Sequence, residues 1–330
     1  MNCKFITVFL KKNILLDVSY LTFANVLVFI SKFFLFIIIA KILGPEQYGL
    51  WILITTIVAY ISLSHLGVLN ALNREIPSNI GKKRDKENDK IQSTSFLTIL
   101  FIVTLINLVG VFLYLYYNEL IYIIASLFFS ATLIYRFIDI ILKSNQRFKL
   151  LAITQAAIIP ILFLGIPLSR HFNLNGWIIT NSISLIIPSI LIFIALDLPF
   201  KKLRFDLYRL KLLIRIGFPI MMVGVLYSLF NTIDRWIILD VLGKKSLGEY
   251  AIVIQTFTIS LLIPNLIAEV YYPRITENYG KFNSYNKLLP QLKNQIILSI
   301  LSYVVIAIPI FLIFPIIINR FLEDYIGGIG

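Results

Sequence analysis

The sequence contains few of the residues that build metal and covalent sites. Its 330 residues include one cysteine, Cys3, and two histidines, His65 and His171. A single cysteine excludes an internal disulfide and a thiolate-rich metal site, and two distant histidines leave zinc or di-iron almost without ligands. The chain also has no Gly-x-x-x-x-Gly-Lys-Ser/Thr motif, so it shows no Walker A loop for ATP. We therefore predict neither a cofactor nor a metal.

Charged residues are scarce as well. They make up 14% of the chain, whereas hydrophobic residues make up 58% and the mean hydropathy is +0.87. Soluble domains are about half apolar and about a quarter charged, and a core of this size cannot hide so much apolar surface from water. The composition predicts an all-α integral membrane protein, a polytopic helical bundle.

Apolar runs between clusters of charge predict about nine transmembrane helices, since each crossing needs roughly 20 apolar residues. The first run follows several lysines, as a signal peptide does, but it has no cleavage site and is interpreted as a retained helix. The nine predicted helices span residues 19–42, 49–71, 94–117, 119–142, 150–169, 175–196, 217–242, 249–272 and 294–318.

Lysine and arginine are distributed unevenly over the connecting segments. A net charge of +13 would suggest nucleic acid in a soluble protein. In membrane proteins, however, basic residues collect in cytoplasmic loops. One side of the predicted membrane holds 22 of the 30 Lys and Arg residues and the other side holds five. This predicts a cytoplasmic N-terminus, residue 330 on the outer side and no nucleic-acid partner.

Two turns in the sequence are alike. Residues 43–51 read LGPEQYGLW and residues 242–250 read LGKKSLGEY, so both combine Leu-Gly, four residues, a Gly and a nearby aromatic. The same offset of 199 aligns Gly81 with Gly280. Because six predicted crossings separate the two turns, the pattern predicts two parallel six-helix lobes related by an axis along the membrane normal.

A basic segment divides the predicted lobes. Residues 198–216 alternate leucines with Lys and Arg at the spacing of an amphipathic helix on the inner membrane surface. We therefore predict an N-terminal six-helix lobe over residues 1–196, a cytoplasmic amphipathic connector over 197–216 and a partial C-terminal lobe of three helices over 217–330.

Three motifs carry a resemblance to a known family. They are the turn at residues 43–51, the Gly217-Phe218-Pro219 sequence that opens the seventh helix, and Asp234-Arg235, which precedes the turn at 242–250. These residues resemble polysaccharide biosynthesis membrane proteins, the O-antigen flippase (Wzx-like) branch of the MOP (MATE-like) exporter superfamily. The resemblance implies two six-helix lobes around a central cavity. It also implies translocation of an undecaprenyl-diphosphate-linked oligosaccharide across the bacterial cytoplasmic (inner) membrane.

The sequence departs from this family pattern after its ninth predicted helix. It ends at Gly330, where a second lobe would need three further helices. We expect a fragment, a truncated reading frame or a member with a reduced second lobe, so the predicted architecture is two-lobed with an incomplete second lobe.

Charged and polar groups inside the predicted helices are the first candidates for a transport site, because a charged headgroup cannot cross hydrocarbon unaided. Lys32 lies in the middle of the first helix, and the repeat offset places it opposite Asn231 of the seventh. Asn231, Asp234 and Arg235 are predicted to share a polar stripe with Tyr227, on which Arg235 binds phosphate. The alternative is structural: an Asp-Arg pair that faces neighbouring helices.

Four more charges are weaker candidates. Arg74 follows the second helix and either holds diphosphate at the inner gate or serves as positive-inside anchoring. Arg136 and Asp139 stand three residues apart, so we expect an intrahelical ion pair. Asp139 and Glu269 are the candidates for coupling to a proton or sodium ion, and only Arg274 is an obvious local partner for Glu269.

These observations predict a flippase that works by alternating access and is not an enzyme. Its expected partners are the lipid-linked oligosaccharide, membrane lipids and polysaccharide-assembly proteins. The alternatives are a small-molecule exporter of the same fold, a membrane-embedded polysaccharide polymerase or glycosyltransferase, and a non-functional fragment. The short outer loops argue against an enzyme, and Lys32 and Arg235 favour an anionic cargo over a cation.

Overall fold

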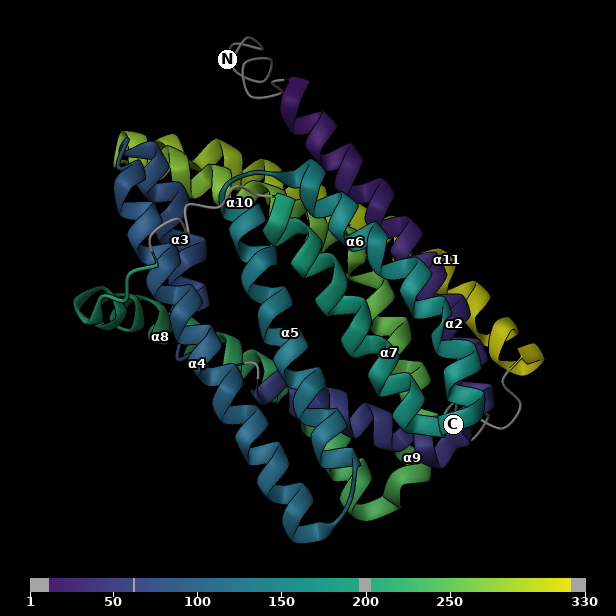
Figure 1. The fold of residues 1–330 in the computed structure, drawn as a ribbon. Coiled ribbons are helices and arrows are strands. Elements are labelled where there is room, and N and C mark those ends of the chain that lie inside the picture. The colour runs from purple at the N-terminus through teal and green to yellow at the C-terminus, as the bar shows by residue number, and fades with distance from the viewer. Residues whose placement is uncertain (1–11, 62, 196–202, 322–330) are drawn as a thin grey trace.

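The computed structural model describes residues 12–61, 63–195 and 203–321, and in these residues it contains helices and no strand. The predicted all-α fold is confirmed (Figure 1). The helices are α2 (Lys12–Ile61), α3 (Val68–Gly81), α4 (Asp85–Tyr117), α5 (Ile121–Ser144), α6 (Phe148–Phe163), α7 (Gly165–Ala195), α8 (Leu207–Phe230), α9 (Ile233–Ser260), α10 (Leu262–Phe282), the short 3-10 helix η2 (Tyr285–Lys287) and α11 (Leu289–Phe321).

Six stretches of the described residues are long and apolar enough to cross a membrane. One of them, Tyr20–Ile61, has 42 residues, about twice the length of one crossing. Its helix bends at Gly44, where the backbone is not helical, so this stretch contains the turn predicted between the first two crossings. The chain is a multi-pass membrane protein. The six stretches are Tyr20–Ile61, Lys86–Tyr117, Ile121–Ser144, Gly165–Ile194, Leu207–Tyr250 and Leu289–Leu312.

The helices expose many large apolar side chains, as membrane-spanning helices do where they contact lipid. Phe23 is 73% exposed, Phe112 66% and Leu115 74%, and so much exposed aromatic and aliphatic surface is stable only in an apolar solvent. The buried side chains form two clusters along the bundle. One includes Trp51 and Trp177, and the other lies around α3 and α5.

The predicted second crossing, residues 49–71, is wrong as one continuous helix. Helix α2 ends at Ile61 and α3 begins at Val68, after Gly67 with a positive φ of 85°. The buried His65 stabilises this break, because its Nδ1 accepts a hydrogen bond from the Gly67 backbone nitrogen at 3.1 Å. The sequence is less apolar only over residues 62–67, and so short a dip does not by itself divide a predicted crossing.

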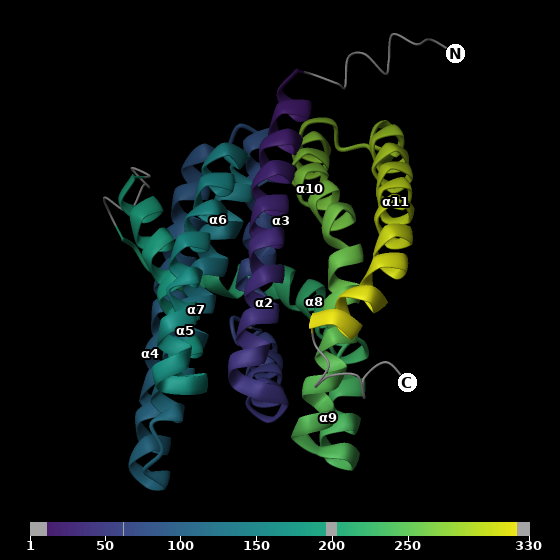
Figure 2. The same ribbon diagram turned by 90° about the vertical axis from the view of Figure 1, so that its right-hand side faces the viewer.

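The predicted connector is wrong as a separate helix. Residues 207–216 continue without interruption into α8, which ends at Phe230, so the predicted helix 217–242 starts too late and is broken in its middle. The cause of the early start is Asp206, whose Oδ1 accepts a hydrogen bond from the Arg209 backbone nitrogen at 3.1 Å and caps α8. Figure 2 shows α8 lying across the other helices. Residues 196–202 of the predicted boundary lie outside the described residues.

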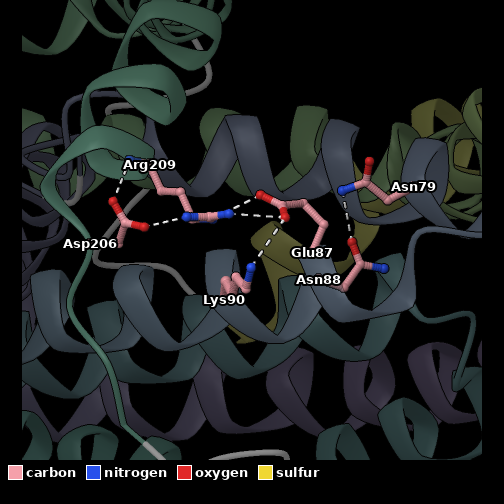
Figure 3. A network of polar contacts seen from close by, with 6 residues as sticks. All are labelled: Asn79, Glu87, Asn88, Lys90, Asp206 and Arg209. Carbon is pink, nitrogen blue, oxygen red and sulfur yellow. Dashed lines mark hydrogen bonds and ion pairs between the residues drawn. The ribbon is translucent and has the colours of Figure 1, made fainter.

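A polar network holds the beginning of α8 against the beginning of α4 (Figure 3). Arg209 donates from Nε and Nη2 to the two carboxylate oxygens of Glu87, at 2.8 and 3.0 Å, and its Nη1 contacts Asp206. Close by, the Asn79 amide of α3 donates to Asn88 of α4 at 3.0 Å. A two-pronged arginine–carboxylate contact fixes orientation as well as distance, so this network sets the position of α8.

The carboxylate of Asp206 makes this network sensitive to pH. Its pKa is lowered from the ordinary value of 3.8, first by the hydrogen bond from the Arg209 backbone and then by the Arg209 side chain. A lowered pKa means that the ionised form stabilises the fold at neutral pH and that this stabilisation is lost as the pH falls through the folded pKa. We expect Asp206→Asn to lower the melting temperature at pH 7, with the difference from wild type shrinking near pH 3. A thermal melt at both pH values, with the exposed Asp89→Asn as control, checks this. An equal difference at both pH values would contradict it.

The two predicted turns have the same backbone conformation. Gly44 has φ 70° and ψ 170°, and Gly243, 199 residues later, has φ 83° and ψ −176°. Glycine adopts positive φ without steric cost, which explains why both turns carry it. The predicted likeness of the two turns is confirmed, and the helices that follow them, in α2 and α9, pack against each other.

Candidate functional site

Lys143 connects the two carboxylates that the sequence singles out. Its Nζ lies 2.7 Å from Oδ2 of Asp139, one turn earlier in α5, and 2.8 Å from Oε1 of Glu269 in α10. The expected Arg136–Asp139 ion pair is therefore wrong: Asp139 pairs with Lys143 at the i, i+4 spacing, which suits a helix equally well. The expected local partner of Glu269, Arg274, is also wrong, because that carboxylate pairs with Lys143.

This ion-paired group links α5 to α10 through the interior of the protein. The Lys143 side chain is 16% exposed and that of Asp139 is 15% exposed. The second oxygen of Glu269, Oε2, is buried without a hydrogen-bond partner among the described residues. One ammonium thus stands between two carboxylates, an arrangement in which removal of Lys143 leaves two negative charges without their counter-ion.

Arg136 is left without an ion pair by this arrangement. It lies on α5 between the buried Leu133 and Phe137 and is only half-buried itself. In the part of the chain that the structure describes, its guanidinium makes no hydrogen bond and no ion pair, although Asp139 and His65 lie near enough to interact with its charge. Because an unpaired arginine is costly inside a membrane protein, it marks a site candidate.

Lys32 is the second unpaired cation. Residues seven apart share a helix face within about 20°, so Lys32 lies on the same side of α2 as Asn25 and Ile39. That side points inward, because Ile39 is fully buried and the Asn25 amide donates to Gln155 of α6 at 2.8 Å. The Lys32 side chain itself is exposed. Its ammonium makes no hydrogen bond or ion pair among the described residues, so it is available to a charged ligand.

The predicted polar stripe on the seventh helix is interrupted. Asn231 and Thr232 form a turn between α8 and α9, and the Asn231 amide donates to the Tyr227 carbonyl oxygen at 2.6 Å. Asn231 therefore satisfies the end of α8 and does not continue one helical face with Asp234 and Arg235. The sequence shows no proline or glycine at this break.

Asp234 and Arg235 have separate side-chain partners. Oδ2 of Asp234 accepts from the Tyr250 hydroxyl at 2.5 Å, whereas Nη1 of Arg235 donates to Thr56 of α2 at 3.1 Å. The Arg235 Nε is buried and has no partner among the described residues. Arg235 thus lies at the junction of α2 and α9, with its Nε–H still available.

Arg74 lies apart from these groups. Its side chain is 50% exposed on α3, and its Nε is 3.8 Å from the neighbouring carboxylate of Glu75. The structure therefore brings together Asp139 and Glu269, leaves Lys32 and Arg136 without an ion pair among the described residues, and places Arg74 apart on α3. Within the described residues, no group of three or more His, Cys, Asp or Glu side chains could hold a metal ion.

Sequence reasoning missed Lys143 and treated Arg136 as a structural residue. Lys143 follows the predicted helix 119–142 and so falls in a basic connecting segment, yet its spacing of four from Asp139 is typical of a helical pair. The role of Glu269 had no such sign, because its partner is 126 residues away in the chain.

The comparison with known families agrees with this architecture. A family model described as "Polysaccharide biosynthesis protein" matches residues 14–279. The chain belongs to the polysaccharide biosynthesis protein family. The matched region contains Lys32, Arg136, Lys143, Arg235 and Glu269, so the interior charges of this polysaccharide biosynthesis protein all lie in the part that defines the family. No curated protein matches the chain.

Proposed function

We propose that this protein translocates an undecaprenyl-diphosphate-linked oligosaccharide, the repeat unit of O-antigen or another surface polysaccharide, across the bacterial cytoplasmic membrane. The observation that carries the proposal is that two cations of the membrane-spanning stretches, Lys32 and Arg136, have no ion pair among the described residues. A diphosphate carries the complementary charge, and a phosphate held by lysine and arginine forms charge-assisted hydrogen bonds. Membership in a polysaccharide biosynthesis family supports the same cargo.

In this mechanism the headgroup enters the bundle while the lipid tail stays in the bilayer. Lys32 and Arg136 bind the diphosphate, and the amides of Asn25 and Gln155 lie on the same inward side of α2 and α6 for sugar hydroxyls. Arg235, with its Nε–H free at the junction of α2 and α9, contacts the headgroup later on its path. Arg74, exposed on α3, is proposed to attract it at the entrance.

Asp139 and Glu269 are proposed to couple transport to a proton or sodium ion. Lys143 occupies the position between them that a coupling cation would take. Binding of a cation to the carboxylates would release Lys143 and loosen the link between α5 and α10. We propose that movement of α5 relative to α10 switches the headgroup site from one side of the membrane to the other.

The same geometry weighs against a small-cation exporter. Such a protein needs carboxylates free to meet its cargo, whereas Asp139 and Glu269 are both already ion-paired with Lys143 here. The protein is proposed to act without catalysis, with its N-terminus in the cytoplasm and residue 330, which lies outside the described residues, on the outer side. Polysaccharide-assembly proteins remain proposed partners.

Reconstitution tests this function directly. Proteoliposomes carry undecaprenyl diphosphate linked to a fluorescent oligosaccharide, and an impermeant quencher reports how much label leaves the outer leaflet. We expect Lys32→Ala to slow translocation at least about tenfold, because one charge-assisted bond to phosphate is lost, and Lys32→Arg to retain most of it. The matched control is Lys41→Ala, an exposed lysine on the same helix. Equal rates in Lys32→Ala and Lys41→Ala would contradict the proposed site.

A further inference from the structure

Two glycine pairs bring the repeated helices together backbone against backbone. Gly49 of α2 meets Gly248 of α9. Gly81 of α3 and Gly280 of α10 form the second pair, in which each glycine lies against the backbone of the other's helix, and this is called the Gly81–Gly280 contact. In each pair the two glycines are separated by the same offset of 199 residues. One pair lies beside the turns at which α2 and α9 bend, and the other lies near the C-terminal ends of α3 and α10.

The Gly49–Gly248 contact is reciprocal. A β-carbon on Gly49 would overlap the carbonyl oxygen of Lys244 and lie 3.3 Å from the Gly248 nitrogen. A β-carbon on Gly248 would overlap the carbonyl oxygen of Pro45 and lie 3.3 Å from the Gly49 nitrogen. Pro45 and Lys244 are themselves equivalent in the repeat, so the two segments face each other across a local two-fold relation.

The Gly81–Gly280 contact repeats this arrangement at the other end. A β-carbon on Gly81 would overlap the carbonyl oxygen of Glu277, and one on Gly280 would lie 2.5 Å from the carbonyl oxygen of Ser78. Ser78 and Glu277 are again 199 residues apart. Both ends of the α2–α3 and α9–α10 segments are therefore closed by equivalent backbone contacts.

Close approach is the reason for glycine at these four positions. None of the four has a positive φ, so their backbone suits any residue. What excludes a side chain is the opposing carbonyl group, which belongs to rigid helical backbone and cannot move aside as a flexible side chain can.

We propose that the Gly49–Gly248 and Gly81–Gly280 contacts are the two closures of the transport pathway, and that they separate one at a time. This proposal rests on the proposed function, because alternating access requires each end to close and open in turn. Backbone contact excludes a bulky headgroup without any side chain having to reorder. In this structure both contacts are formed. A side chain added at one contact wedges that end apart and leaves the other end packed.

Distances between spin labels on the full chain in nanodiscs test the proposal. Labels are attached in a Cys3→Ser background at two pairs of exposed positions, each equivalent in the repeat. Glu46 and Lys245 report on the Gly49–Gly248 end, and Lys82 and Lys281 report on the Gly81–Gly280 end. The measurement is the label–label distance at each end, which needs no substrate.

We expect Gly49→Val to lengthen the Glu46–Lys245 distance by about 2 Å or more, since helix separation follows the size of the contacting side chains. The Lys82–Lys281 distance stays unchanged in this variant. We expect Gly280→Val to lengthen the Lys82–Lys281 distance and to leave the Glu46–Lys245 distance unchanged. The control is Gly224→Val on α8, where a β-carbon has nothing within 4 Å, and it changes neither distance.

Unchanged distances in Gly49→Val and Gly280→Val, or a change at both ends in either one, would overturn the proposal. If a valine variant does not fold, Gly49→Ala and Gly280→Ala give the same two-sided test with a smaller shift. The translocation assay separates this result from the proposed function. If the distances change as expected in the glycine variants but the wild-type protein does not translocate the oligosaccharide, the proposed function is refuted. If the wild-type protein translocates the oligosaccharide but the distances in the variants do not change, the two closures are refuted.

Discussion

Replacing Arg136 with alanine should reduce translocation of the lipid-linked oligosaccharide by about 10- to 100-fold without unfolding the protein. The guanidinium makes no ion pair or hydrogen bond in the described structure, so its loss breaks neither kind of contact. A hydrogen bond to a charged group is worth about 1.5–3 kcal/mol, and that range corresponds to the expected loss of rate if Arg136 holds the diphosphate. The proteoliposome assay measures the rate, and a thermal melt in detergent measures stability.

The matched control for this experiment is Arg147→Ala. Arg147 follows α5 by a few residues and is exposed, so it shares the charge and the region of sequence but not the interior position. Arg136→Lys should keep part of the activity, because lysine preserves the charge and loses the planar fork. A large loss of melting temperature in Arg136→Ala with unchanged translocation would show that Arg136 is structural.

Replacing Lys143 with methionine should destabilise the protein by about 3–5 kcal/mol, the typical cost of breaking a buried ion pair by removing one partner. Methionine keeps the length of the side chain but leaves the carboxylates of Asp139 and Glu269 without their shared counter-ion. The expected result is a lower melting temperature together with loss of translocation. Thermal melts and the proteoliposome assay on the same preparation check both.

A neutral background separates charge from packing in this prediction. Adding Asp139→Asn and Glu269→Gln to Lys143→Met removes the uncompensated carboxylates, so most of the lost stability should return. Translocation should not return, because the proposed coupling carboxylates are gone. Lys149→Met, an exposed lysine nearby, should leave both properties unchanged. An equally low melting temperature in the neutral triple variant would mean that packing, and not charge, sets the stability.

Composition and local backbone chemistry are sufficient for the fold class and for the turns. An apolar fraction of 58% requires lipid as solvent, whatever the packing of the helices. The turns at Gly44 and Gly243 are also local properties, because glycine adopts the positive φ that each turn needs. These features follow from single residues or short windows, so they can be predicted without knowledge of distant contacts.

The positions of the helix breaks and the partners in the ion pairs could be established only from the tertiary structure. Hydropathy falls at residues 62–67 and 231–235 over too few residues to mark a helix end. The helix ends there depend on hydrogen bonds such as that from Gly67 to His65. The sequence offered Arg136 as the partner of Asp139, whereas the approach of α10 brings Glu269 to Lys143, and Asp139 pairs with that lysine too. An ion pair depends on which helices become neighbours. The sequence by itself therefore determined a helical membrane protein with a repeated turn, and only the packing decided which of its interior cations are left unpaired.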